Sequence, residues 1–282
     1  MNEQNMDILE RIHASYYQLT NTEKRVADYV LSQHEQVQFM SITQLAEACG
    51  TAEATISRFC RTLKLKGFNA FKIELARHSV PEKKNVSMTG NHTFSDRCRE
   101  AAKMATDAVQ QTIDLMDPVQ MEKAMELIEA APHIMCIGSG GSMIMASDCA
   151  HQFSTVDPKF YYVVDSHMQM SAAATMGLED VIILFSYSGA TNTGIQILKL
   201  AKQRGVKTIL VTRFNKSPAA KLADVVLLCG SNEAPLQSGS VPAKVAQLVV
   251  VDVLFREYYN RNQAFCDENI QRIGAALSDM HV

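Results

Sequence analysis

The sequence predicts an all-α N-terminal domain with a helix-turn-helix, followed by an α/β domain built on a doubly wound, five-stranded parallel sheet. Three observations predict this division. The chain has 282 residues, more than most single domains contain, its first part reads as helices without a strand, and its later part alternates short apolar runs with helical stretches. A polar segment with Pro81 and Gly90 separates the two patterns. We therefore expect domains at 1–78 and 95–282, joined by a linker at 79–94.

Capping signals mark the first helices. We expect a helix from Met6 to Tyr17, and a second that opens at Thr20 and runs to about Gln33. Thr20 with Glu23, and Ser41 with Gln44, have the spacing of capping boxes, in which two side chains satisfy free backbone NH groups at a helix start.

The segment 41–63 has the pattern of helix, tight turn and helix. A short helix over 41–49 is broken by Gly50, and a second helix resumes over 52–63. Leu45, Ala46 and Cys49 can pack against Ile56 and Phe59. The side chains left pointing outward would be Glu53, Thr55, Ser57, Arg58 and Arg61. A second helix with a polar and basic outer face suits the major groove of DNA.

Charge is distributed unevenly. The net charge is −3, yet the stretch from Thr55 to Arg77 carries only Glu74 against six basic residues: Arg58, Arg61, Lys64, Lys66, Lys72 and Arg77. Such a patch can neutralise phosphates and release their counterions, which makes binding dependent on salt. The alternative is an ordinary solvated helix face. Together with the helix-turn-helix pattern, the patch favours nucleic-acid binding.

Five apolar runs in the second part have the length of buried parallel strands. They lie at 133–137, 160–164, 181–185, 207–211 and 225–229, with helices expected at 95–116, 118–130 and 245–259 among others.

Two loops that follow these strands are rich in glycine and hydroxyl residues. The segment 185–193 reads FSYSGATNT, and the segment 137–142 reads IGSGGS. Hydroxyls donate hydrogen bonds, glycine lets backbone NH groups come close, and a helix start attracts an anion. One such loop could be an ordinary turn. Two after parallel strands indicate a site for one phosphorylated small molecule.

Several classes of protein are excluded by composition. The seven cysteines are scattered and form no CxxC pair, which argues against disulfides and zinc and fits a reducing cytoplasm. The sequence contains no apolar run of the roughly 18 residues that a membrane helix needs. The first residues lack the apolar stretch of a secretion signal. We expect a cytoplasmic protein with no membrane segment, metal or cofactor.

The order of these motifs resembles that of the RpiR family of transcriptional regulators, which join a helix-turn-helix to a sugar isomerase (SIS) domain. The segments that carry the resemblance are LTNTEKRVADYVL, SITQLAEACG, EATISRFCRTL, LKGFNAFK, IGSGGS, FSYSGATNT and VAQLVVVDVLF. The resemblance covers nearly the whole chain. It implies a homodimer or homotetramer that binds operator DNA of sugar-metabolism genes under the control of a phosphorylated sugar.

The resemblance also implies site residues. For DNA these are Glu53, Ala54, Thr55, Ser57, Arg58 and Arg61, with Lys64 and Lys66 on the backbone. We expect Arg58 to read a base edge, because a guanidinium pairs bidentately with guanine; its alternative is a phosphate contact or an ion pair. For the effector they are Ser139 and Ser142, then Ser186, Ser188 and Thr191, with Glu233 a candidate for a sugar hydroxyl. The alternative for Ser139 and Ser142 is helix capping.

The chain departs from the family pattern at two positions. Ala52 stands where relatives often have a serine cap, so we expect Thr51 to cap instead. Pro242 and Lys244 stand where relatives often have serine and arginine. We expect Lys244 either to meet the phosphate of the effector as a point charge, and not bidentately, or to pack against a partner subunit.

The alternative is a phosphosugar isomerase or lyase whose helical N-terminal part only mediates oligomerisation, because SIS enzymes isomerise phosphosugars by moving a proton. The candidate acids and bases are Glu233, His151 and His167. A lone histidine is more often structural, and catalysis needs an acid and a base that converge. We therefore expect binding without turnover, and no catalytic residue.

Overall fold

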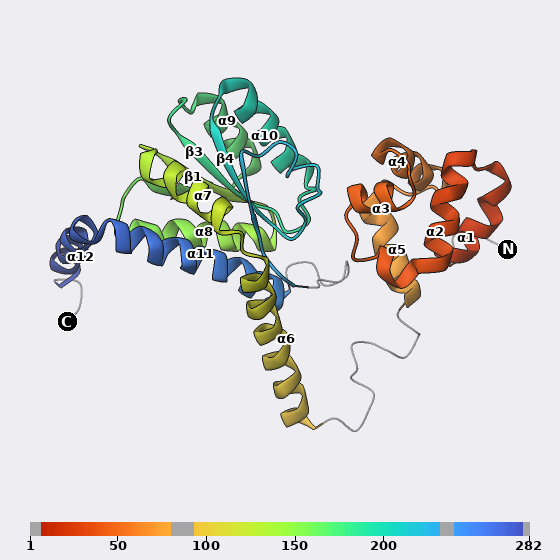
Figure 1. The fold of residues 1–282 in the computed structure, drawn as a ribbon, viewed down its shortest axis with the longest axis horizontal. Coiled ribbons are helices and arrows are strands. Elements are labelled where there is room, and N and C mark those ends of the chain that lie inside the picture. Colours follow the sequence, from red (N-terminus) through yellow and green to blue (C-terminus); the bar gives the residue numbers. More distant parts are fainter. Residues whose placement is uncertain (1–6, 80–92, 232–239, 279–282) are drawn as a thin grey trace. The chain divides into compact units, whose positions relative to one another are not determined.

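The computed structural model describes residues 7–79, 93–231 and 240–278 (Figure 1). It forms two compact units, one up to Lys103 and the other from Met104 onward. Most of the predicted linker, together with Glu233, lies outside the described residues.

The first unit contains helices and no strand among its described residues. Its elements are α1 (Ile8–Ser15), the 3-10 turn η2 (Tyr16–Gln18), α2 (Asn21–Val37), α3 (Ile42–Ala48), α4 (Glu53–Thr62) and α5 (Phe68–Ser79). The expected capping boxes at Thr20 and Ser41 are both present, and their hydroxyls accept the NH groups of Glu23 and Gln44. The helix that opens at Thr20 continues past the expected end because the chain bends at Gln33 (φ −135°) and resumes its helical path.

A single apolar core holds these helices together. Ile12, Val26, Leu45, Phe59 and Phe71 contribute to it and have no exposed surface. The rings of Phe59 and Phe71 meet edge to face with centroids 5.6 Å apart, a favoured geometry for aromatic pairs. This pair fastens α4 to α5.

The second unit is built on the predicted five-stranded parallel sheet. Its strands are β1 (Ile134–Gly138), β2 (Phe160–Tyr162), β3 (Val181–Phe185), β4 (Lys207–Thr212) and β5 (Val225–Leu228). Their spatial order is β2-β1-β3-β4-β5, and every pair is parallel. The predictions of fold class and strand positions are confirmed.

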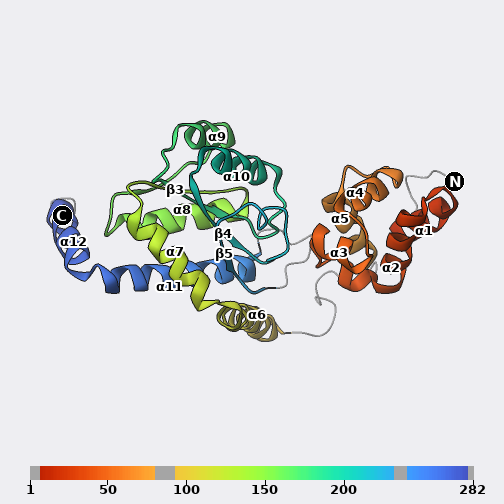
Figure 2. The same cartoon turned by 45° about the horizontal axis from the view of Figure 1, so that its top comes forward.

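Helices cover both faces of the sheet. The helices from Phe94 onward are α6 (Phe94–Leu115), α7 (Pro118–Ala130), α8 (Gly141–Ser154), α9 (Ser166–Thr175), α10 (Asn192–Arg204), α11 (Val241–Arg261) and α12 (Gln263–Ser278). One face packs against α7, α8 and α11, and the other against α9 and α10 (Figure 2). Successive residues of β1 alternate between these layers: Ile134 and Cys136 face the first, and Met135 and Ile137 face the second.

The helix α11 begins earlier than the sequence predicted. Its first residue is Val241 and not Val245, because Ser240 caps it and Pro242 occupies the first turn, where a missing NH costs nothing. Lys244 therefore lies within this helix and not ahead of it.

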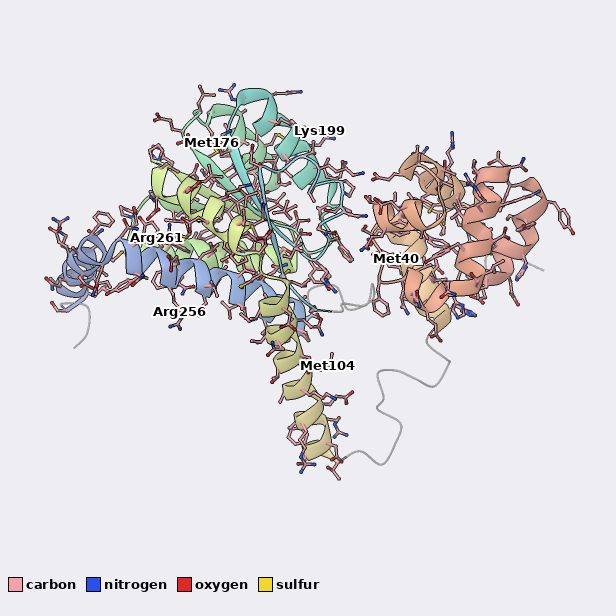
Figure 3. The ribbon with its side chains drawn as sticks, in the orientation of Figure 1. Met40, Met104, Met176, Lys199, Arg256 and Arg261 are labelled. Atoms are coloured by element: carbon pink, nitrogen blue, oxygen red, sulfur yellow. The ribbon has the colours of Figure 1, made fainter. Side chains whose placement is uncertain are left out.

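An ion pair between side chains joins the C-terminal end of α11 to α7. Arg261 donates hydrogen bonds of 2.9 and 2.7 Å to the carboxylate of Glu122 and also pairs with Glu257 on its own helix (Figure 3). No helix in the described part of the chain is both long and apolar enough to cross a bilayer.

Candidate effector and nucleic-acid sites

The two hydroxyl-rich loops lie at the topological switch point of the sheet. The chain leaves β1 through α8 toward β2, and leaves β3 through α10 toward β4, so the connections run in opposite directions from neighbouring strands. Gly138 at the end of β1 is paired with Phe185 at the end of β3. Both loops therefore start at the same edge of the sheet, and ligands of open α/β sheets bind there.

The first loop brings the backbone of α8 close to β1. A Cβ on Gly138 would lie 2.7 Å from the carbonyl oxygen of Ser142, so only glycine fits at this position. The N-cap of α8 is Gly140 (φ 56°), and no side chain caps the helix. The structure thus contradicts the alternative that Ser139 or Ser142 caps α8. Ser139 is exposed and Ser142 is half-buried.

The second loop is held by contacts with its neighbours. Gly189 has φ 58°, and its carbonyl accepts the NH of Ala219 at 2.9 Å. Thr191 is the N-cap residue of α10, but its side chain makes no capping bond. The Ser188 hydroxyl accepts the NH of Ala190 at 3.3 Å.

Ser186 differs from the other hydroxyl residues of this loop. It is 4% exposed, and its Oγ has no hydrogen-bond partner among the described residues. Buried polar atoms without partners are rare and costly in folded proteins, so this hydroxyl calls for a ligand or a water molecule.

The helix α11 reaches the first loop through Gln247, whose Nε2 donates to the Ser142 Oγ at 3.4 Å. Lys244 lies three residues earlier and therefore on the same side of the helix. This places a positive charge on the side of α11 that faces the first loop. Among the described residues, Lys244 has no ion-pair partner, and it is half-buried.

The candidate catalytic histidines lie on different helices. His151 is near the end of α8, about 13 Å along the helix axis from Ser142. There it lines a cavity of about 540 Å³ with Asp148, Tyr161 and Tyr162, which has no residue in common with the two loops. His167 is exposed in the first turn of α9.

The helix-turn-helix is formed by α3, a turn over 49–52, and α4. The turn closes when Thr51 donates its NH to Ala46 at 2.8 Å, and Gly50 takes φ 60°. Ala52 is the N-cap of α4 and has no side chain that could cap it. The expectation that Thr51 caps instead is wrong, because its Oγ1 is buried without a partner.

The outward face of α4 is narrower than predicted. Ala54, Arg58 and Arg61 are exposed, whereas Glu53 and Ser57 are half-buried at its margins. Thr55 is 4% exposed, so the prediction that it points outward is wrong. It precedes Phe59 by four residues and therefore lies on the buried side with it.

Hydrogen bonds within the domain fix several of these side chains. Thr43 on α3 donates to the Glu53 carboxylate at 2.7 Å, and Arg58 donates to the buried Thr55 hydroxyl at 3.2 Å. Thr62 donates to Glu23 on α2 at 3.3 Å. The bonds from Thr43 and from Thr62 join α4 to α3 and α2, which sets the direction of the outer face of α4.

Glu23 is itself perturbed by this arrangement. Burial raises its pKa, but hydrogen bonds from Thr20 and Thr62 and the nearby Arg58 charge outweigh burial, so its pKa is lower than usual. The carboxylate is therefore held ionised beside α4.

Two lysines follow α4. Lys64 takes φ 58°, and the NH of Leu65 bonds to the carbonyl of Cys60 at 2.9 Å, which ends the helix in a left-handed turn. Lys64 and Lys66 are both exposed. Within the described ranges, no three acidic, cysteine or histidine side chains gather as a metal site would require.

Sequence reasoning missed Thr43 and Gln247. Thr43 forms its bond across the turn, which a local pattern does not reveal. Gln247 had a signal, since it is a polar residue in the buried face of α11 beside Ala243, Ala246 and Val250.

Each of the two parts of the chain matches the model of a known protein family. The helix-turn-helix domain of the rpiR family matches residues 6–81, and the SIS domain matches residues 126–256. An uncharacterised HTH-type transcriptional regulator of Caldanaerobacter subterraneus subsp. tengcongensis is 33% identical over 251 residues, which cover 88% of this chain and 89% of that protein. One of Clostridium perfringens is 32% identical and covers 97% of this chain and 100% of that protein.

Solved structures extend this likeness. The NanR protein of Vibrio vulnificus, solved in complex with ManNAc-6P, is 28% identical with a TM-score of 0.87, over 98% of this chain and 100% of that one. A putative sugar-phosphate isomerase of Listeria monocytogenes shares the fold at 20% identity, with a TM-score of 0.57 over 64% of this chain and 95% of that one.

The fold and the paired loops thus define a regulator with a helix-turn-helix and a SIS domain. The chain belongs to the RpiR family of HTH-type transcriptional regulators.

Proposed function

We propose that this regulator binds operator DNA of sugar-metabolism genes and that a phosphorylated sugar in its SIS domain controls the affinity. The observation that carries the proposal is the pair of loops at the ends of β1 and β3. Both lead into helices whose N-terminal NH groups no side chain caps, at Gly140 and at Thr191. Such NH groups, with nearby hydroxyls and a lysine, suit a dianion.

The effector site would consist of the predicted residues of both loops and α11. Ser139, Ser142, Ser186, Ser188 and Thr191 would hold the phosphate, and Lys244 would supply a point charge. The ligand class is supported by the relative from Vibrio vulnificus, which was solved with ManNAc-6P. Glu233, outside the described residues, stays a candidate for a sugar hydroxyl.

The DNA site would be the outer face of α4. Arg58 would read a base edge, Ala54, Ser57 and Arg61 would lie beside it together with Glu53, and Lys64 and Lys66 would contact the phosphates. Arg58 keeps its proposed role at guanine, and its bond to Thr55 would hold it in one orientation.

Control would work through assembly. A homodimer or homotetramer can place two recognition helices at a spacing that matches two half-sites, and the effector would change that spacing. If the effector changes DNA affinity, then DNA changes effector affinity by the same factor, typically worth about 1 to 3 kcal/mol.

We propose no catalytic turnover. The relatives above 30% identity are named transcriptional regulators, whereas the isomerase likeness is one of fold. Action on operator DNA also agrees with the cytoplasmic location that the cysteines indicate.

A mobility-shift assay with DNA upstream of the protein's own gene tests the proposal. Retardation should weaken with salt and respond to a millimolar phosphosugar from a panel that includes ManNAc-6P. Arg58→Ala should lose retardation, and Ser188→Ala should lose only the response. Arg204→Ala on α10 and Ser171→Ala on α9 serve as matched controls. Intact binding by Arg58→Ala would refute the recognition-helix assignment, and interconversion of a phosphosugar observed by NMR would refute the absence of turnover.

A further inference from the structure

Gln247 is a buried polar residue whose side chain contributes little to the stability of the fold. It lies on α11, is 2% exposed, and has the apolar residues Ala246, Val250 and Val251 beside it on the buried side of the helix. Its Nε2 makes one long hydrogen bond, 3.4 Å, to Ser142. Its Oε1 has no partner among the described residues.

This arrangement destabilises the fold relative to an apolar side chain. A buried carbonyl oxygen without a donor loses its bond to water and gains nothing in return, and one long bond at the other end is weak compensation. Gln169 shows the contrast. It is also 2% exposed, but its Nε2 donates to the carbonyls of Val163 at 2.8 Å and Gly138 at 3.1 Å, so it fastens α9 to the sheet.

The bond from Gln247 has a chemical consequence for Ser142. A serine hydroxyl has one hydrogen and accepts through its lone pairs. When the Gln247 amide donates to Ser142 Oγ, the hydroxyl hydrogen has to point away from α11. Ser142 is half-buried in the first turn of α8, where the helix start favours an anion. A donor oriented in this way is ready for a phosphate oxygen.

We propose that Gln247 is a positioning residue of the effector site: it donates to Ser142 and thereby directs the Ser142 hydroxyl hydrogen to the bound anion. This inference rests on the proposed function of the two loops. Bonds in such a chain polarise one another, so the amide strengthens the contact between Ser142 and the ligand. A glutamate would do the opposite, because its carboxylate would accept the Ser142 hydrogen and repel a dianion.

The experiment uses the full-length protein and measures two quantities for each variant: the melting temperature without ligand, and the affinity for ManNAc-6P and for inorganic phosphate by calorimetry. Gln247→Leu should melt at the same or a higher temperature than the wild type, yet bind ManNAc-6P about tenfold more weakly. Gln247→Glu should bind more weakly still. Gln169→Leu is the control for a structural glutamine and should lower the melting temperature.

A double substitution isolates the pathway through Ser142. Ser142→Ala should weaken binding, and adding Gln247→Leu should weaken it no further, because the amide would have nothing left to orient. Additive losses, unchanged binding by Gln247→Leu, or a melting temperature that falls together with its affinity would overturn the role of Gln247 alone. If the wild type bound neither ManNAc-6P nor phosphate nor any phosphosugar of the panel, the proposed function would fail, and this inference with it.

Discussion

Thr43 in the first turn of α3 donates a hydrogen bond of 2.7 Å to the carboxylate of Glu53, the first residue of α4. Thr43 is buried and Glu53 is half-buried, so the bond is partly shielded from water. It holds the Glu53 carboxylate at the start of α4, where the helix dipole favours a negative charge. A carboxylate at this place can accept a hydrogen bond from the amino group of cytosine.

We therefore expect Thr43→Val to weaken binding to the operator. The substitution keeps the shape of the side chain and removes the bond, so the Glu53 side chain has to be ordered when DNA binds, which costs about 1 kcal/mol, or roughly fivefold in affinity. Binding to unrelated DNA should change little, because phosphate contacts carry that affinity. Fluorescence anisotropy with operator and unrelated duplexes measures both, with Thr175→Val on α9 as the control. Equal losses on the two duplexes would contradict a role in specificity.

Lys66 is expected to contribute to the affinity for all DNA and not to specificity for the operator. Its exposed side chain follows α4 and would contact the phosphate backbone. Lys66→Ala should weaken binding to all duplexes alike and reduce the slope of log affinity against log salt by about 0.9, the value for one phosphate contact. A titration at four or more salt concentrations measures the slope, and Lys202→Ala on α10 should leave it unchanged. An unaltered slope in Lys66→Ala would remove this lysine from the interface.

The sequence predicted best those features that depend on neighbouring residues. The capping boxes at Thr20 and Ser41 use side chains three residues apart, and the strands are apolar runs bounded by polar residues, so local pattern was sufficient. Because the strands were expected to be parallel, both loops were expected at their carboxyl ends, but only the structure shows that β1 and β3 are neighbours.

The predictions from the sequence were wrong where contacts between distant residues, or the direction of a side chain, determine the structure. Thr55 was expected outside because it is polar, but the phase of the helix puts it beside Phe59. The helix α11 was expected to begin at Val245, but it begins at Val241 with Pro242 in its first turn, where proline is favoured. The bonds from Thr43 to Glu53 and from Gln247 to Ser142 join separate helices, and no spacing along the chain encodes them.

The low pKa of Glu23 predicts acid sensitivity of the helix-turn-helix unit. A carboxyl whose folded pKa is below its unfolded value, about 4.3, stabilises the fold above that value. The contribution is lost as the pH falls through the lower folded pKa. Thermal unfolding of the full-length protein between pH 7 and pH 3 should show this loss, and Glu23→Gln should flatten the dependence. Glu35→Gln, an exposed glutamate on the same helix, is the control; equal curves for the two variants would contradict the prediction.

The glycines of the two hydroxyl-rich loops, 137–142 and 185–193, predict a graded response to alanine. Gly140 and Gly189 both have φ near 60°, at 56° and 58°, so alanine is strained by about 1 to 3 kcal/mol at either position. A Cβ on Gly140 would meet nothing within 4 Å, whereas one on Gly189 would lie 2.1 Å from the Oγ of Ser217. Ser217 has no exposed surface and little room to retreat. Gly189→Ala should therefore lower the melting temperature more than Gly140→Ala does. Ser217→Gly should restore part of the loss in Gly189→Ala and none in Gly140→Ala, since it removes the overlap but not the strain. Equal melting temperatures for the two alanine variants would mean that Ser217 can move, and that the second loop is not held as tightly as its contacts indicate.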